Sequence, residues 1–385
     1  RALGVPAVTG IANASQIITP GMPLLIDGQS GKVVLEPAPQ ELQASVVRQA
    51  SYDRIVQDAV DAEECECKTC DGTKVRLFAN IGRPFEVDLV ARHHLDGVGL
   101  FRTEYLFLDE PYAPSFERQR EIYCKVAAAL DGLPLVIRTL DLGGDKWPAF
   151  LKPRFEANPN LGVRGLRFSL FAAEELFHAQ IRAALHAAKE HNVRIMLPMV
   201  LGQADLQHAV SIIHKIAEEN GIINLPPVGA LVETPAAVFA IDEILANCDF
   251  ISIGTNDLTQ FVLAADRNAT ALIDDYTILH PSVLRAVQRV ITAADGAGKS
   301  ATICGEAAAD PRVACLLVGL GARRLSMNPV SAAQVRYAVR AARKDSLEQL
   351  AQAALTSDST QTVSTLVSDA LRSIYPEFGS GTVSV

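Results

Sequence analysis

Residues 250–267 read FISIGTNDLTQFVLAADR and give the strongest indication of the fold. The apolar, β-branched start at 250–253 predicts a buried strand, which stops at Gly254. A polar cluster, TND, follows, and a helical pattern runs on from it. A strand end with Asn and Asp side chains beside close backbone is a place to hold a metal ion and an anion. The alternative is an ordinary strand–loop–helix connection in which Asp257 caps the helix.

The same alternation of strand and helix extends to both sides of this stretch. Amphipathic segments such as 172–191 and 281–297 separate most of eight candidate strands. These are 75–81, 97–101, 135–140, 194–200, 228–232, 250–253, 301–304 and 324–327. Eight strands alternating with helices over about 250 residues predict an α/β fold, a (β/α)8 TIM barrel. An open doubly wound sheet is the alternative, but it would require a glycine-rich phosphate loop after its first strand, and NIGRP at 80–84 is not one.

Shorter segments flank the expected barrel. Residues 1–38 contain short β-type runs broken by Gly and Pro, too few for an independent α/β domain. Residues 39–75 are expected to form a helical linker, with a helical pattern over 39–65. The barrel and its C-terminal helices are placed at 76–378, with two helices after 345 and a break at 357–360. Residues 379–385 are expected to be a disordered tail.

Composition limits the class of protein. The chain has 385 residues, is 49% hydrophobic and carries a net charge of −9, which argues against a nucleic-acid partner. An anionic substrate would therefore need a local cluster of arginines. No apolar run reaches about 18 residues and no signal peptide is visible, so no membrane insertion is expected. Seven scattered cysteines favour reduced thiols and a cytoplasmic location. The start at Arg1 rather than Met suggests a fragment.

Two of the candidate strands end in arginine. Arg102 follows the second strand and Arg138 closes the third, with Lys146 in the glycine-containing loop beyond. Guanidinium groups bind phosphate and carboxylate through paired hydrogen bonds, so we expect an anion site at this rim. The alternative is that each arginine pairs with a nearby acid, Glu104 or Asp141.

Other strand ends carry acids and a thiol. Glu233 ends the fifth strand and lies one strand away from Asp257; two such carboxylates provide part of an octahedral Mg²⁺ site. Either acid could instead favour a helix N-terminus. Cys304 ends the seventh strand before a glycine, where a catalytic role competes with core packing. Arg164, in the loop NPNLGVR at 158–164, is a third candidate arginine, or belongs to a turn.

A cysteine cluster stays open to two interpretations. Cys65, Cys67 and Cys70 have the spacing C-x-C-x2-C, which offers three metal ligands rather than four. His93 and His94 are conceivable fourth ligands. Whether these cysteines bind anything cannot be decided from the spacing.

Several motifs occur together in one order: GVGLFRTEYLF, VIRTLDLGGDK, NPNLGVRGLR, RIMLPMV, LVETPAA, SIGTNDLTQFVLAADR and ICGEAAAD. They resemble the C-terminal half of enzyme I of the bacterial phosphoenolpyruvate (PEP):sugar phosphotransferase system, over nearly the whole chain. The resemblance implies a barrel of the PEP/pyruvate-binding type that uses Mg²⁺. In that family Arg102 and Arg138 match the arginines that hold the phosphoryl group. Glu233 and Asp257 match the Mg²⁺ ligands.

Further family positions follow from the same motifs. Asn256 and Arg267 match residues that contact the substrate. Cys304 matches the acid–base cysteine that protonates the enolate carbon to give pyruvate. Lys146 and Arg164 match positions near the substrate whose roles are less defined.

The resemblance also implies partners: PEP and pyruvate, a histidine acceptor on a swivelling domain, the phosphocarrier HPr, and a second copy of the barrel in a homodimer. Position 1 falls just after the family's acceptor-histidine motif, so residues 1–38 resemble the end of the phosphohistidine domain. On this basis we expect a PEP-protein phosphotransferase chain that binds PEP and dimerises but does not complete phosphotransfer alone.

Two alternatives remain. One is the C-terminal domain of a pyruvate phosphate dikinase or PEP synthase, which shares parts of these motifs. The other is a non-catalytic PEP-sensing or dimerisation module, for which a proton donor such as Cys304 has no use.

Overall fold

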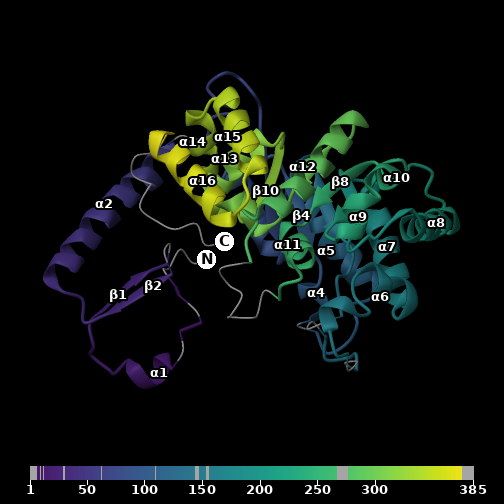
Figure 1. Ribbon diagram of the computed structural model, residues 1–385. Coiled ribbons are helices and arrows are strands. Elements are labelled where there is room, and N and C mark those ends of the chain that lie inside the picture. The colour runs from purple at the N-terminus through teal and green to yellow at the C-terminus, as the bar shows by residue number, and fades with distance from the viewer. Residues whose placement is uncertain are drawn as a thin grey trace.

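A closed barrel of eight parallel strands forms the centre of the chain (Figure 1). The computed structural model describes residues 7–8, 10–11, 13–28, 31–61, 63–108, 110–143, 147–152, 156–266 and 276–374. The strands close in the order β10-β3-β4-β5-β6-β7-β8-β9. Their bounds are β3 Arg76–Ile81, β4 Val98–Arg102, β5 Leu135–Arg138, β6 Val193–Leu197, β7 Val228–Val232, β8 Phe250–Ile253, β9 Ala301–Ile303 and β10 Arg324–Met327. The predicted TIM barrel is confirmed, and the closure excludes the open sheet.

Alternation along each strand separates two layers of the core. In β3, Leu77, Ala79 and Ile81 belong to the large apolar core beneath the helices, whereas Phe78 and Asn80 face the barrel interior. The interior has a second apolar cluster of its own, made by Leu100, Val136, Met196, Leu231, Phe250 and Cys304. Polar side chains at the strand ends therefore lie above or below this apolar cluster.

Helices surround the barrel and cover its outer core (Figure 1). Their bounds are α3 Asp88–Arg92, α4 Tyr105–Leu108, α5 Phe116–Ala128, α6 Leu166–Phe171, α7 Glu174–Ala188, α8 Gln203–Glu219, α9 Pro235–Phe239, α10 Ile241–Leu245, α11 Thr255–Leu263, α12 Pro281–Gly296, α13 Pro311–Gly319 and α14 Ala332–Ala341. Short 3-10 turns lie at Pro84–Val87, Pro159–Leu161, Glu306–Ala309 and Pro329–Ser331. Within the described residues, no helix combines the length and apolar character needed to cross a bilayer.

Two further helices, α15 (Lys344–Thr356) and α16 (Thr360–Ile374), follow the barrel, as the sequence predicts for this stretch. The contact between α13 and α15 is close at Gly319, where a Cβ atom would lie 2.1 Å from the carbonyl oxygen of Leu347. Only glycine permits this approach of the two backbones. The expected tail at 379–385 lies outside the described residues.

The N-terminal part contains α1 (Ala14–Ile17), an antiparallel pair β1 (Leu24–Asp27) and β2 (Lys32–Leu35), and the long helix α2 (Pro39–Asp61). Helix α2 packs against α14. The expected helical linker ends earlier than predicted, because α2 stops at Asp61 and residues 63–75 form a turn-rich connection. Gly72 has a φ of 94° there, a conformation incompatible with a continuing helix.

Candidate functional site

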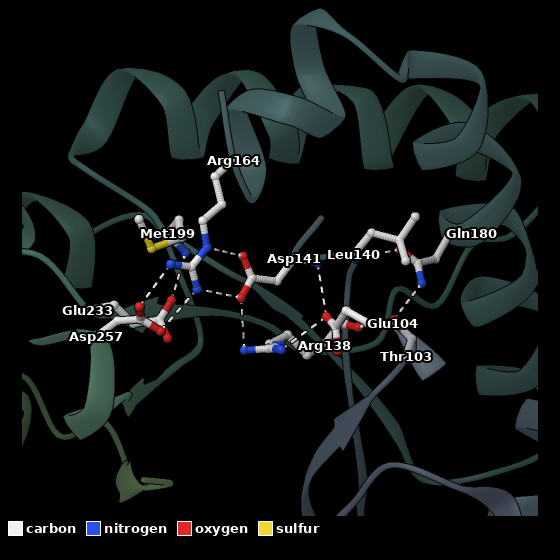
Figure 2. Close-up of polar contacts among 10 residues, drawn as sticks. All are labelled: Thr103, Glu104, Arg138, Leu140, Asp141, Arg164, Gln180, Met199, Glu233 and Asp257. Atoms are coloured by element: carbon white, nitrogen blue, oxygen red, sulfur yellow. Dashed lines mark hydrogen bonds and ion pairs between the residues drawn. The ribbon is translucent and has the colours of Figure 1, made fainter. Parts of the chain in front are cut away.

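The C-terminal ends of the barrel strands and the turns after them, here called the rim, carry most of the predicted site residues. Figure 2 shows four of these residues, Arg138, Arg164, Glu233 and Asp257. Arg138 ends β5 and is buried. Its Nη2 lies 3.0 Å from Oε1 of Glu104, and its Nη1 lies 3.4 Å from Oδ2 of Asp141. The pairing with nearby acids that the sequence left open therefore occurs at Arg138. Its Nε atom is buried without a hydrogen-bond partner in the described structure, which leaves one donor for a ligand.

Charge around Arg138 keeps its guanidinium ionised. Burial opposes the charge, but the carboxylates of Glu104, Asp141 and Glu233 outweigh burial and raise the pKa of Arg138 above its ordinary value. Glu104 also accepts a hydrogen bond of 2.9 Å from the backbone N–H of Asp141. The arginine is thus held by groups that are themselves fixed to the backbone.

Arg164 joins two carboxylates at the centre of the rim (Figure 2). Its Nε and Nη2 donate to the two oxygens of Asp141, both at 3.0 Å. Its Nη1 and Nη2 donate to the two oxygens of Asp257, at 2.9 and 3.1 Å. The next residue, Gly165, has a φ of 59° and lies against Met199, which fixes the turn that aims Arg164 inward.

Glu233 and Asp257 come from adjacent strand ends. Glu233 follows β7 and accepts a hydrogen bond of 3.1 Å from the N–H of Met199. Gly254 leaves room for it, because a Cβ atom there would lie 2.4 Å from Oε1 of Glu233. Burial, and then the charges of Asp257 and Asp141, raise the pKa of Glu233 to about 8.

This carboxylate pair suits a hard divalent cation. Both ligands are oxygens, and after burial the charges of Asp257 and Asp141 are the main causes of the raised pKa of Glu233. Among the described residues, no three His, Cys, Asp or Glu side chains gather to form a complete metal site. A cation here would therefore take two protein carboxylates, and other ligands would have to complete its coordination.

Cys304 lies just beyond β9, between the interior cluster and the rim charges. Its N–H donates to the carbonyl of Ile253 at 3.0 Å, and its thiol lies 3.4 Å from the same oxygen. Burial and the charge of Glu233 raise the pKa of the thiol to about 12, against the opposing effect of Arg138 and Arg102. The thiol is therefore protonated at neutral pH and lies within the field of the predicted anion site.

Arg102 and Asn256 occupy the same rim. Arg102 ends β4 in register with Arg138, and its Nε is buried with no hydrogen-bond partner in the described structure. The side-chain oxygen of Asn256 accepts the N–H of Glu306 at 3.1 Å, which ties α11 to the turn after Cys304. The other two predicted substrate contacts, Lys146 and Arg267, lie outside the described residues.

A buried polar network that sequence reasoning missed supports the arginines (Figure 2). Gln180 on α7 accepts the N–H of Leu140 at 2.8 Å and donates to Oγ1 of Thr103 at 3.0 Å and to the Tyr123 hydroxyl at 3.1 Å. Thr103 in turn donates to the carbonyl of Arg138 at 2.8 Å. The only signal for Gln180 in the sequence is a polar residue on an apolar helix face.

The cysteine cluster shows no metal geometry in the described residues. Cys67 is buried, and burial raises the pKa of its thiol to about 12, whereas Cys65 and Cys70 are exposed.

Comparison with known proteins places this rim in context. A phosphoenolpyruvate-protein phosphotransferase of Haloferax volcanii is 38% identical over 365 residues, which cover 93% of this chain and 63% of that protein. A multiphosphoryl transfer protein of Xanthomonas campestris pv. campestris is 37% identical over 367 residues, 95% of this chain and 44% of that protein. The chain therefore spans less than two thirds of the length of these relatives. Among solved structures, a citrate lyase from Burkholderia xenovorans LB400 aligns with a TM-score of 0.46 and 16% identity over 83% of this chain and 97% of that one.

A family model described as the PEP-binding domain of PEP-utilising enzymes matches residues 57–344. The match contains the whole barrel, from β3 to β10, together with the rim acids, arginines and thiol described above. It also covers most of the chain. The chain therefore belongs to the family of PEP-utilising enzymes, of which it contains the PEP-binding domain.

Proposed function

We propose that the barrel binds PEP at this rim as part of a Mg²⁺-dependent PEP-protein phosphotransferase, and that pyruvate is the product. The observation that carries the proposal is the position of Cys304, a protonated thiol whose charged neighbours are Arg102, Arg138 and Glu233. A phosphate-binding pair of arginines beside a proton donor matches the two needs of PEP cleavage, namely anion binding and protonation of carbon.

Arg102 and Arg138 hold the phosphoryl group. They end neighbouring strands in register, and each has a buried Nε without a partner in the described structure. Such donors gain a charge-assisted hydrogen bond when an oxyanion arrives. Asn256, Arg164, Lys146 and Arg267 are also proposed to contact the substrate, with Arg267 near the phosphate and the bridging oxygen. The roles of Lys146 and Arg267 rest on the sequence alone.

Glu233 and Asp257 hold Mg²⁺. The bound cation would neutralise charge on the phosphoryl oxygens during transfer. Asp257 reaches the cation only if Arg164 shares its carboxylate or releases one oxygen, because both oxygens accept from that guanidinium in the ligand-free geometry. Arg164 therefore links the metal position to Asp141 and, through it, to Arg138.

Cys304 supplies the proton. When the bond between phosphorus and the bridging oxygen breaks, the phosphoryl group passes to the acceptor and the electron pair stays with the enolate oxygen. The methylene carbon of the enolate then takes the proton from the thiol, which gives pyruvate and leaves a thiolate. The raised thiol pKa keeps the proton on sulfur until a strong base, the enolate carbon, is formed.

The proposed acceptor is a histidine on a swivelling domain, from which an HPr-type phosphocarrier receives the phosphoryl group. We also propose that the protein is cytoplasmic and that it forms a homodimer through the barrel. The names of the relatives, phosphoenolpyruvate-protein phosphotransferase and multiphosphoryl transfer protein, support transfer of the phosphoryl group from PEP to a protein acceptor. A sensing module would need the arginines but not the thiol.

Calorimetric titration of PEP tests the proposal. We expect binding with Mg²⁺ and at least about ten-fold weaker binding with EDTA or in Asp257→Ala, because a charge-assisted contact is worth about 1.5–3 kcal/mol. Cys304→Ala should bind PEP normally, and should release no pyruvate when a phosphorylatable acceptor domain is supplied in trans. Equal binding with Mg²⁺ and with EDTA would contradict the metal assignment, and normal pyruvate release by Cys304→Ala would contradict the role of the thiol.

A further inference from the structure

Three arginines lie at the opposite end of the barrel from the rim. Arg76 and Arg324 are the first residues of β3 and β10 and are paired in register, and Arg194 is the second residue of β6. The residues next to them, such as Leu77, Leu325 and Ile195, belong to the outer core. Because side chains alternate along a strand, the three arginines point to the interior side of the barrel.

Two of these guanidinium groups rest on aromatic rings inside the barrel. Cζ of Arg324 lies 4.5 Å from the ring centroid of Phe78, and Cζ of Arg194 lies 5.8 Å from that of Phe250. Gly229 makes room for the second contact, since a Cβ atom there would lie 2.4 Å from the Phe250 ring. Each ring contacts one side of its guanidinium group and supplies no formal negative charge to balance it.

Among the described residues, the acids at this end of the barrel include Asp96 before β4 and Asp249 before β8, and each accepts the backbone N–H of a neighbouring strand. None of the described residues forms an ion pair with Arg76, Arg194 or Arg324, and Nε of Arg194 is buried without a hydrogen-bond partner. Nε of Arg324 donates to the Thr302 hydroxyl at 3.3 Å, which leaves its charge unbalanced.

The charges act on one another. Burial, and then Arg194 and Arg76, lower the pKa of Arg324 to about 10, against the opposing effect of Asp96. The carboxylate of Asp96 already accepts the N–H of Leu77 at 2.8 Å. Arg194 and Arg324 are half-buried, whereas Arg76 is exposed beside them. Half-buried cations without a carboxylate partner are costly for a fold, so the first two are explained best by a ligand that balances their charge.

This end is separate from the rim. The charges that act on Cys304 are Glu233, Arg138 and Arg102, whereas those that act on Arg324 are Arg194, Arg76 and Asp96. No group belongs to both sets. The apolar interior cluster that contains Phe250 and Cys304 lies between them.

We propose that Arg76, Arg194 and Arg324 form a second anion site at the N-terminal end of the barrel, which binds a small oxyanion of the phosphate or sulfate type. The chemistry is that of guanidinium forks, which donate paired hydrogen bonds to tetrahedral oxyanions. A free inorganic anion and the phosphate group of a small monoester offer the same atoms to this site.

Thermal unfolding of the full chain in sodium phosphate tests this inference, with sodium chloride at equal ionic strength as reference. A ligand at about ten times its Kd should raise the midpoint by about 2 °C. The shift should disappear in Arg194→Gln and in Arg324→Gln. It should persist in Arg289→Gln, a control at an exposed arginine of α12 that pairs with Asp242. In chloride alone, Arg194→Gln should be no less stable than the parent, because one of three repelling charges is gone.

One more variant and two more ligands locate the bound anion and identify its chemical source. Arg102→Gln should keep the rise of the thermal midpoint in phosphate. If that rise is lost in Arg102→Gln but not in Arg194→Gln, the anion binds at the rim, which overturns the inference without affecting the proposed function. Sulfate and glycerol 3-phosphate replace phosphate in parallel titrations: a larger shift with glycerol 3-phosphate indicates a monoester ligand, and equal shifts indicate a free oxyanion. The absence of any shift beyond that in chloride would overturn the site.

Discussion

Replacing Arg164 with methionine removes the guanidinium that contacts both Asp141 and Asp257 at the rim. All three side chains are buried: Arg164 is 3% exposed, Asp141 1% and Asp257 6%. Four hydrogen bonds of 2.9–3.1 Å are lost, and two carboxylates stay behind next to Glu233 without this partner. Removing one partner of a buried ion pair costs about 3–5 kcal/mol. We expect Arg164→Met to lose about that much free energy of unfolding.

The matched control is Arg289→Met. Arg289 also makes a short ion pair, 2.8 Å to Asp242, but the two side chains are 52% and 66% exposed, so its loss should cost about 0–1 kcal/mol. Urea unfolding followed by circular dichroism, with EDTA present, measures both values. At about 2.1 cal/mol/K per residue, 385 residues give an unfolding entropy near 0.8 kcal/mol/K, so the midpoint of Arg164→Met should fall by about 4–6 °C. If the two variants lose equal stability, the rim pairs contribute no more than surface pairs and the reasoning is refuted.

Three further predictions concern other parts of the structure. Gly254→Ala should fold but bind PEP and Mg²⁺ about ten-fold more weakly in calorimetry, because its Cβ displaces the Glu233 carboxylate; unchanged affinity would contradict this. Gln180→Leu should lose about 2–4 kcal/mol of unfolding free energy in urea, because it leaves the buried N–H of Leu140 without its hydrogen-bond acceptor. The exposed Gln207→Leu should lose almost none. Stability should also fall in alkaline solution, because burial raises thiol pKa values from 9.0 to about 11 or 12 and unfolding lowers them again. The stabilisation from the protonated, buried thiols is complete below pH 9 and is lost as the pH rises through 11–12. The loss is up to about 1.4 kcal/mol per thiol and pH unit, and thermal unfolding across pH 8–11 would measure it. The thiols are Cys67, Cys248, Cys304 and Cys315.

The strands could be predicted because their physics is local. A strand buried on both faces must be apolar, and in β8 the run Phe250–Ile253 stops where Gly254 begins the turn. Parallel closure then brings every strand end to one rim, which is why Arg138, Glu233 and Cys304 could be assigned to one site from their positions alone.

The partners of these residues could not be predicted, because they depend on the turn geometry between distant segments. Arg164 is one of several arginines in its part of the sequence, and only the turn at Gly165 directs it between Asp141 and Asp257. Gln180 lies in a helix whose pattern is otherwise apolar on that face, and its contact with Leu140 spans 40 residues. Such contacts are determined by packing, and no local pattern in the sequence encodes them.

Charge balance links the cation and anion positions at the rim. Seven charged side chains of the site described above are three guanidinium groups and four carboxylates, so with all of them ionised one negative charge is in excess. These groups are Arg102, Arg138, Arg164, Glu104, Asp141, Glu233 and Asp257. Burial, and then the charges of Asp257 and Asp141, raise the pKa of Glu233 to about 8, so this carboxyl group is largely protonated at neutral pH and the seven groups then carry no net charge. A divalent cation held by Glu233 and Asp257 would displace that proton and leave the rim with a net positive charge, so we expect binding of the cation to strengthen binding of an anion.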